Sequence, residues 1–133
     1  MHIRKNALAL LSATILLVGI ASYVWAKKSS TSTLYTERGI SSWYGKKYHG
    51  KITASGKKFD MHALTAAHKT LPFNTLVNVR NLENNKVVTV KITDRGPYSG
   101  KRIIDLSYEA AKKIGGINKG LVEVEITAQL ASQ

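Results

Sequence analysis

The stretch KITDRGPYSGKRIIDLS (residues 91–107) joins the end of one strand, a sharp turn and the start of another strand. Residues 87–93 (VVTVKIT) alternate apolar and polar side chains, which predicts a strand with one buried face. Asp94 ends that strand, and Arg95-Gly96-Pro97 turns the chain at once. Residues 102–106 (RIIDL) predict the next short strand. A carboxylate is therefore expected at a strand end, beside a basic side chain.

Short β-type runs separated by turn residues recur on both sides of this stretch. The predicted strands are residues 40–44, 64–67, 76–81, 87–93, 102–106 and 121–127. One helix is predicted after the N-cap Ser107, and Gly115 and Gly116 end it. Six short strands and one short helix favour a mainly β fold, a small closed barrel, because closure removes exposed strand edges.

The first 26 residues are typical of a targeting segment. Arg4 and Lys5 precede an uncharged apolar run, residues 7–20, and a cleavage point is plausible after Ala26. Residues 1–26 are therefore predicted to be a signal peptide. A retained N-terminal membrane anchor stays open, since the uncharged stretch is about long enough to span a bilayer. Both interpretations predict an exported, periplasmic or secreted protein, with membrane attachment through residues 7–26 in the second.

The rest of the chain is expected to hold one domain. Residues 27–38 are polar and rich in Ser and Thr at their start, which predicts a flexible tether, and residues 39–128 are the predicted barrel. The chain contains no cysteine, so neither a lipidated N-terminal cysteine nor a disulfide is expected. No metal site and no cofactor are predicted, because the histidines lack a metal-ligand spacing and no phosphate-binding loop is present.

The chain is strongly basic, with 20 Lys and Arg against 8 Asp and Glu. Only two of these basic residues, Arg4 and Lys5, precede residue 27, so the net charge falls from +12 to +10 without the first 26 residues. Such a charge favours a polyanionic partner, or it serves solubility alone. Export argues against nucleic acid and favours anionic lipid, wall polymers or peptidoglycan carboxylates.

Asp94 is the carboxylate with the strongest case for chemistry. Its position at a strand end fits a catalytic group and, equally, an ion pair with Arg95 or Arg102 that fixes the turn. Asp105 lies two residues before the helix cap, so a turn-stabilising acceptor is the simpler interpretation there. His68 follows a small apolar run, where a polar residue can close a strand.

Three stretches of the sequence resemble the rare lipoprotein A (RlpA) family. They are GISSWYGKKYHGKITASGKKFD, LTAAHKTLPFNTLVNVRNLENNK and VKITDRGPYSGKRIIDLSYEAAKKIG, and together the resemblance covers residues 39–127. Their motifs WYG, TASG, LTAAHKTLPF and DRGP occur in that order. The resemblance implies a six-stranded double-psi β-barrel, related in fold to expansins, with a cleft across its face.

The resemblance also implies an activity. Active members of the family are lytic transglycosylases, which cleave peptidoglycan glycan strands and prefer strands without stem peptides. Asp94 matches the family's catalytic aspartate and His68 its cleft histidine. The family's catalytic glutamate follows the TASG turn, and this chain has Lys57 there. An ammonium group cannot replace a carboxylic acid as acid and base.

Three functions therefore stay open. The first is a lytic transglycosylase with Asp94 and His68 as its catalytic residues. The second is a non-catalytic, expansin-like glycan-binding barrel, and the third is a basic exported adaptor for a protein or an anionic polymer. Peptidoglycan glycan strands are the predicted partner, and the protein is expected to be a monomer. The predicted substrate-binding residues are Trp43, Tyr44, Lys57, Arg95 and Tyr98.

Overall fold

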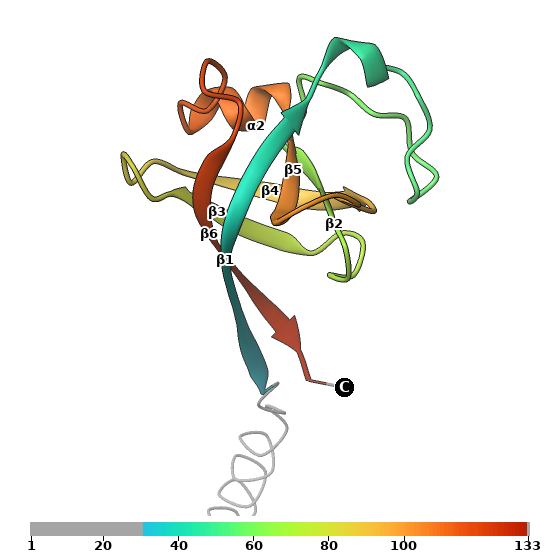
Figure 1. Cartoon of the computed structure of the whole chain (residues 1–133). Coiled ribbons are helices and arrows are strands. Elements are labelled where there is room, and N and C mark those ends of the chain that lie inside the picture. The colour runs from blue at the N-terminus through green and yellow to red at the C-terminus, as the bar shows by residue number, and fades with distance from the viewer. Residues whose placement is uncertain (1–30, 133) are drawn as a thin grey trace, which may run out of the picture. The chain divides into compact units, whose positions relative to one another are not determined.

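Strands with alternating apolar residues close into a barrel in residues 31–132, the part of the chain that the computed structural model describes (Figure 1). The strands are β1 (Ser32–Tyr44), β2 (Thr65–His68), β3 (Leu76–Asn81), β4 (Val87–Asp94), β5 (Arg102–Ser107) and β6 (Val122–Ala131). A 3-10 turn, η1 (Lys46–Tyr48), follows β1, and a short helix, α2 (Tyr108–Lys113), follows β5. The mainly β, six-stranded fold with a short helix is confirmed.

The order of strands around the barrel is β1-β5-β2-β4-β3-β6. β1 pairs with β5 and β2 with β4 in parallel, and the remaining neighbours are antiparallel. In this register Ala67 of β2 lies opposite Asp94 on one side and opposite Asp105 on the other. Two strand spacings, about 10 Å, therefore separate the backbones of these two aspartates.

The core fills the barrel with aliphatic side chains from β2 to β6 and from the helix, and β1 packs Tyr35 and Trp43 against it. Strands β3, β4 and β6 contribute alternate residues, as the sequence pattern predicts. The least exposed large members are Ile92, Ile104, Leu106, Ile114, Ile126, Val77, Val79, Val90 and Val124. Since strand neighbours point to opposite faces, Asp105 emerges on the outside of the barrel between the buried Ile104 and Leu106. Asp94 ends β4 after an irregularity in its pairing with β2, where simple alternation no longer holds.

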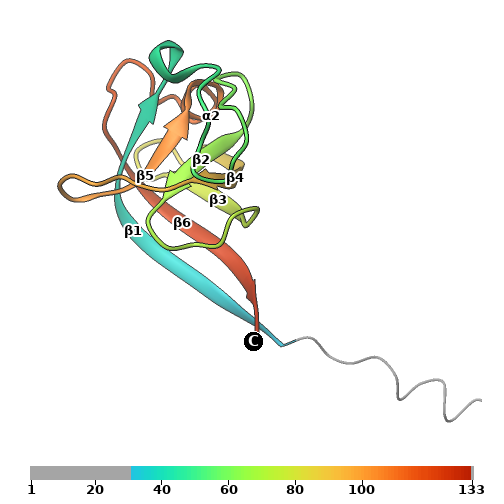
Figure 2. The ribbon, with the colours of Figure 1, turned by 90° about the vertical axis from the view of Figure 1, so that its right-hand side faces the viewer.

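The predicted tether is wrong for residues 32–38. β1 begins at Ser32 and pairs with β6 from Ser32↔Ala131 onward, so these residues belong to the barrel's longest strand. Threonine and tyrosine favour extended backbone, and the far end of β6 supplies the partner that the sequence pattern did not reveal. In Figures 1 and 2 the two strand ends run together as a ribbon beyond the rest of the barrel.

The predicted targeting segment, residues 1–26, lies outside the described residues. Within residues 31–132 no helix has both the length and the apolar character that crossing a bilayer requires. The helix that is present, α2, has six residues and packs over one end of the barrel (Figure 2).

Ser107 joins helix and barrel through two hydrogen bonds. Its Oγ accepts from the Ala110 amide at 3.2 Å and donates to the Ala63 carbonyl at 2.6 Å, and the side chain is fully buried. Ser107→Ala is therefore expected to lower the free energy of unfolding by about 1–2 kcal/mol, because a cap and a buried bond are lost together. Chemical denaturation measures this change, and Ser99→Ala, at an exposed serine, is the matched control. Equal midpoints for the two variants would contradict the expectation.

Candidate active site

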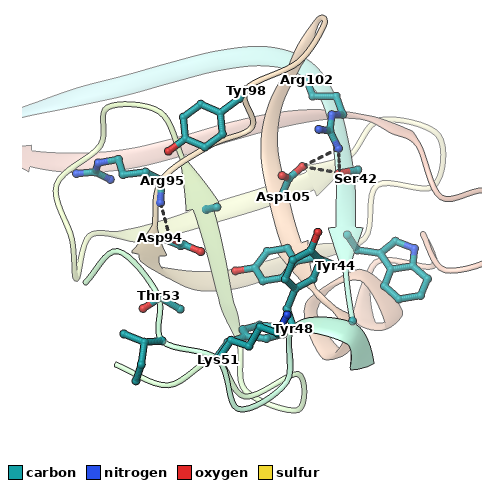
Figure 3. Close-up of a pocket in the computed structure, with 15 residues that line it drawn as sticks. Ser42, Tyr44, Tyr48, Lys51, Thr53, Asp94, Arg95, Tyr98, Arg102 and Asp105 are labelled. Atoms are coloured by element: carbon teal, nitrogen blue, oxygen red, sulfur yellow. Dashed lines mark hydrogen bonds and ion pairs between the residues drawn. The ribbon is translucent and has the colours of Figure 1, made fainter. Parts of the chain in front are cut away.

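A cleft of about 480 Å³ lies where the ends of β1, β4 and β5 meet the long loop that follows β1 (Figure 3). Its walls come from segments far apart in the chain. The lining residues are Ser42, Trp43, Tyr44, Gly45, Tyr48, Lys51, Ile52, Thr53, Phe59, Ala67, Asp94, Arg95, Tyr98, Arg102 and Asp105. The barrel thus gathers two carboxylates, several aromatic rings and basic groups around one opening.

Asp94 is held at the end of β4 by backbone donors. Its Oδ1 accepts from the amide of Ala54, at 2.9 Å, and from its own neighbour Arg95, at 2.9 Å. Ala54 belongs to the TASG turn, so this turn and the DRGP turn orient the carboxylate together. Gly96 adopts φ +121°, a conformation that side-chain-bearing residues rarely take, which explains the glycine of the DRGP turn. The half-buried Asp94 side chain lines the cleft.

Asp105 forms the second acidic group of the cleft. Its Oδ1 accepts a short hydrogen bond from the Ser42 hydroxyl and lies 3.3 Å from the Arg102 guanidinium. Arg102 in turn donates to Ser42 Oγ at 2.7 Å and to Ser99 Oγ at 2.9 Å. On the sequence alone, the simpler interpretation of Asp105 is a turn-stabilising acceptor. The available signal was a carboxylate between Ile104 and Leu106, whose buried side chains force Asp105 outward.

Tyr44 lines the same cleft as the two acidic groups (Figure 3). Its ring packs against Phe59, with centroids 4.4 Å apart, and its buried hydroxyl has no hydrogen-bond partner among the described residues. Burial raises the pKa of Tyr44 well above its usual value, and the charges of Asp94 and then Asp105 raise it further. The phenol therefore stays neutral and can donate a hydrogen bond into the cleft.

The other predicted aromatic residues take different positions. Trp43 packs edge-on against Tyr108, with ring centroids 5.6 Å apart, and adjoins the core while lining the cleft in part. Tyr98 is 87% exposed on the turn beyond DRGP, at the mouth of the cleft. Tyr48, which the sequence interpretation did not name, also lines the cleft and packs against Tyr44, with centroids 5.9 Å apart.

Lys57 is exposed and does not line the cleft. Its carbonyl accepts from the Thr53 amide at 2.8 Å and from Thr53 Oγ1 at 2.7 Å, which closes the TASG turn. The backbone at position 57 thus stabilises the turn that donates to Asp94, and the exposed side chain starts from the edge of that turn.

His68 does not line the cleft, in contrast to the position that the family resemblance implies. Its side chain is 3% exposed, and Nδ1 accepts from the amides of Thr70, at 3.1 Å, and Leu71, at 3.0 Å. The proton is therefore assigned to Nε2, which donates to Glu37 Oε2 at 3.1 Å. The burial follows from β1, since Glu37 and Tyr35 come from the segment expected to be a tether.

Arg95 connects the His68 turn to the cleft. Its guanidinium donates to the carbonyls of Leu71, at 2.9 Å, and His68, at 3.3 Å, and lies 4.0 Å from the centroid of the Phe73 ring. These contacts direct the charged group of Arg95 away from the carboxylate of Asp94. Arg95 therefore ties the DRGP turn to the His68–Leu71 segment, although the residue also borders the cleft.

The barrel topology and this cleft define the class of the protein: a double-psi β-barrel with a cleft lined by two carboxylates, basic groups and aromatic rings. Residues 36–126 match the family model described as "Lytic transglycolase". The chain belongs to this family, within the RlpA group. It is 52% identical over 92 residues to "Endolytic peptidoglycan transglycosylase RlpA" of Vibrio cholerae, which covers 69% of this chain and 35% of that protein. The chain spans between a third and two fifths of the length of the curated relatives it matches first.

Solved structures with low sequence identity share the fold. A Streptomyces papain inhibitor matches with a TM-score of 0.56 and 21% identity, covering 72% of this chain and 94% of its own. The apo expansin of Clavibacter michiganensis matches with a TM-score of 0.57 and 17% identity, covering 71% of this chain and 50% of its own. At these identities the likeness shows the barrel architecture alone.

Proposed function

We propose that this domain is a lytic transglycosylase that cleaves the bond between N-acetylmuramic acid and N-acetylglucosamine in peptidoglycan strands without stem peptides. Membership of the lytic transglycolase family supports the reaction class. The observation that carries the proposal is the orientation of Asp94, whose Oδ1 is occupied by two backbone amides while its carboxyl group borders the cleft.

Asp94 would act first as acid and then as base. Its protonated carboxyl group gives a proton to the glycosidic oxygen as the bond from that oxygen to muramoyl C1 breaks. The muramoyl 6-hydroxyl then bonds to C1, and its proton passes to the carboxylate that the first step produced. Atoms and charge balance without water, and the product carries a 1,6-anhydro ring. One carboxyl group therefore suffices for both proton transfers.

Other residues of the cleft would hold the strand. Tyr44 offers a neutral hydroxyl next to Asp94, and the exposed ring of Tyr98 offers a face for a sugar ring, with Trp43 contributing its accessible edge. Asp105 is paired with Arg102 and accepts from Ser42, so it would hold this side of the cleft in place and leave the proton transfers to Asp94. In this proposal His68 and Arg95 act through the turn and do not touch the sugar.

Peptidoglycan lies on the outer side of the cytoplasmic membrane, so the proposed substrate requires export. We propose that residues 1–26 direct it, either as a cleaved signal or as an anchor. The two forms differ by 26 residues in mass, which intact-mass spectrometry of the protein recovered from cells distinguishes.

A specific observation favours a second function, that of a non-catalytic glycan-binding barrel. Lys57 stands where the family's glutamate is expected, so the chain lacks that carboxylate next to the TASG turn. Aromatic rings and basic groups along the cleft would still bind a glycan strand, and an expansin shares the fold.

One assay separates the two functions. The purified protein is incubated with peptidoglycan whose stem peptides an amidase has removed, and the soluble products are analysed by mass spectrometry. A transglycosylase releases fragments with 1,6-anhydromuramoyl ends. Sedimentation with sacculi without any anhydro product would leave the binding function and contradict the proposed reaction.

Lys57→Glu is expected to raise the rate of anhydro product formation by about tenfold or more, because it supplies a second carboxylate beside the turn that orients Asp94. Lys58→Glu makes the same change of charge one residue further on and is the matched control. A parental rate in Lys57→Glu, or an equal gain in both variants, would show that position 57 has no specific part in catalysis.

A further inference from the structure

The loop that follows β1 gives the cleft one strongly basic side. Residues 45–59 contain five lysines, Lys46, Lys47, Lys51, Lys57 and Lys58, and no aspartate or glutamate. Six residues of this segment line the cleft, and Lys51 is the lysine among them. The strand ends that face it carry both charges, since Arg95 and Arg102 line the cleft beside Asp94 and Asp105. A bound strand therefore meets a loop with only positive charges on one side and a wall of mixed charge on the other.

Two of these lysines share one aromatic ring. The ammonium group of Lys47 lies 5.6 Å and that of Lys51 5.7 Å from the centroid of the Tyr48 ring, and Tyr48 is 43% exposed. Within the described residues no carboxylate lies within 4.0 Å of either ammonium group. Figure 3 places Lys51 and Tyr48 together at one edge of the pocket. The ring holds two positive charges close together without neutralising them, an arrangement suited to a single anionic group.

We propose that the Lys47–Lys51 pair binds the lactyl carboxylate of N-acetylmuramic acid. This inference rests on the proposed function, since it assumes that the cleft holds a peptidoglycan strand. The lactyl group is attached to C3 of the same sugar whose C1 reacts, so it enters the cleft with that sugar. On the strand side, Arg102 is paired with Asp105, and Arg95 donates to backbone carbonyls. The lysine side therefore offers the cations that have no carboxylate partner among the described residues.

This arrangement would select the form of the substrate. The lactyl carboxyl group is an uncharged amide while a stem peptide is attached, and it becomes a free carboxylate when the peptide has been removed. A peptide-free strand therefore presents one lactyl carboxylate per disaccharide to the Lys47–Lys51 pair. The carboxylates of an intact stem peptide lie further from the sugar, outside the cleft.

Binding to an inactive form tests the inference separately from catalysis. Asp94→Asn protein is titrated with peptide-free oligosaccharides and with the same oligosaccharides whose lactyl carboxyl groups have been converted to methylamides. The charged ligand is expected to bind about fivefold more tightly, a ratio that falls toward one as salt is added. In the Lys47→Gln/Lys51→Gln double variant, also in the Asp94→Asn background, the ratio is expected to be near one at all salt concentrations.

The matched control is Lys86→Gln/Lys91→Gln, which removes the same charge from exposed lysines outside the cleft. Equal affinity for the two ligands, or the same loss of preference in both double variants, would overturn the inference and leave only a general effect of net charge. Failure of the proposed reaction looks different: the parent protein would then yield no anhydro product and could still prefer the charged ligand.

Discussion

Asp94→Asn is expected to lower the rate of 1,6-anhydro product formation by about a hundredfold to ten-thousandfold, the range that a positioned acid–base group contributes. An amide can neither give nor accept the proton at neutral pH. Its Oδ1 can still accept the hydrogen bonds from Ala54 and Arg95, so the TASG and DRGP turns keep their geometry. Initial rates on peptide-free strands, quantified by mass spectrometry, measure the effect.

Asp60→Asn is the matched control for this substitution. Asp60 is exposed, also accepts a backbone hydrogen bond, from His62 at 2.9 Å, and does not line the cleft. The control is expected to keep the parental rate, and both variants are expected to keep the parental melting temperature and to sediment with sacculi. An Asp94→Asn protein that forms anhydro products at the parental rate would remove Asp94 from the proposed mechanism.

The features that the sequence predicted well depend on local pattern. Alternation in residues 87–93 located β4 and left Asp94 at its end, and Ser107 with the glycines at 115 and 116 bounded the helix. Such signals are readable because strand period, capping and turn chemistry act over a few residues. The number of short strands favoured closure into a barrel, and the family resemblance then supplied its double-psi topology, which no local pattern contains.

The features that were missed depend on contacts between distant segments. Asp105 reaches the cleft because β5 pairs with β2, which puts it across Ala67 from Asp94. His68 lies outside the cleft because residues 32–38 form a strand, which places Glu37 within hydrogen-bond distance of His68 Nε2. The positions of Asp105 and His68 both follow from the barrel's strand order. Neither the place of Asp105 near a helix cap nor the polar start of the expected tether indicates that order.

The surroundings of His68 make its removal the largest expected effect on stability. Glu37 Oε2 accepts from His68 Nε2 and from the Tyr35 hydroxyl, the latter at 2.5 Å. Burial, with the nearby Glu37 carboxylate, raises the pKa of Tyr35 to about 12, so this phenol remains a donor at neutral pH. On the other side of the ring, Nδ1 accepts hydrogen bonds from the amides of Thr70 and Leu71. The carbonyl of Leu71 in turn accepts a hydrogen bond from Arg95.

His68→Ala is therefore expected to lower the free energy of unfolding by about 3 kcal/mol, because it opens a cavity and leaves backbone amides unpaired. For a domain of this size the melting temperature would fall by about 10–20 °C. Thermal unfolding followed by circular dichroism measures the change. His62→Ala, at an exposed histidine, is the control and is expected to stay within about 2 °C of the parent.

Two further variants divide the contribution of the ring between its nitrogen atoms. His68→Asn puts an acceptor near the place of Nδ1, and His68→Gln puts a donor near the place of Nε2. Asparagine is expected to retain more stability, since the amides of Thr70 and Leu71 would otherwise be left without an acceptor, whereas the Glu37 side chain is 34% exposed and can be hydrated. Folded His68→Asn is also expected to keep KM and to lose less in kcat than Asp94→Asn. A contrary result would be a His68→Ala protein that keeps the parental stability but loses as much activity as Asp94→Asn. His68 would then be a residue that touches the substrate.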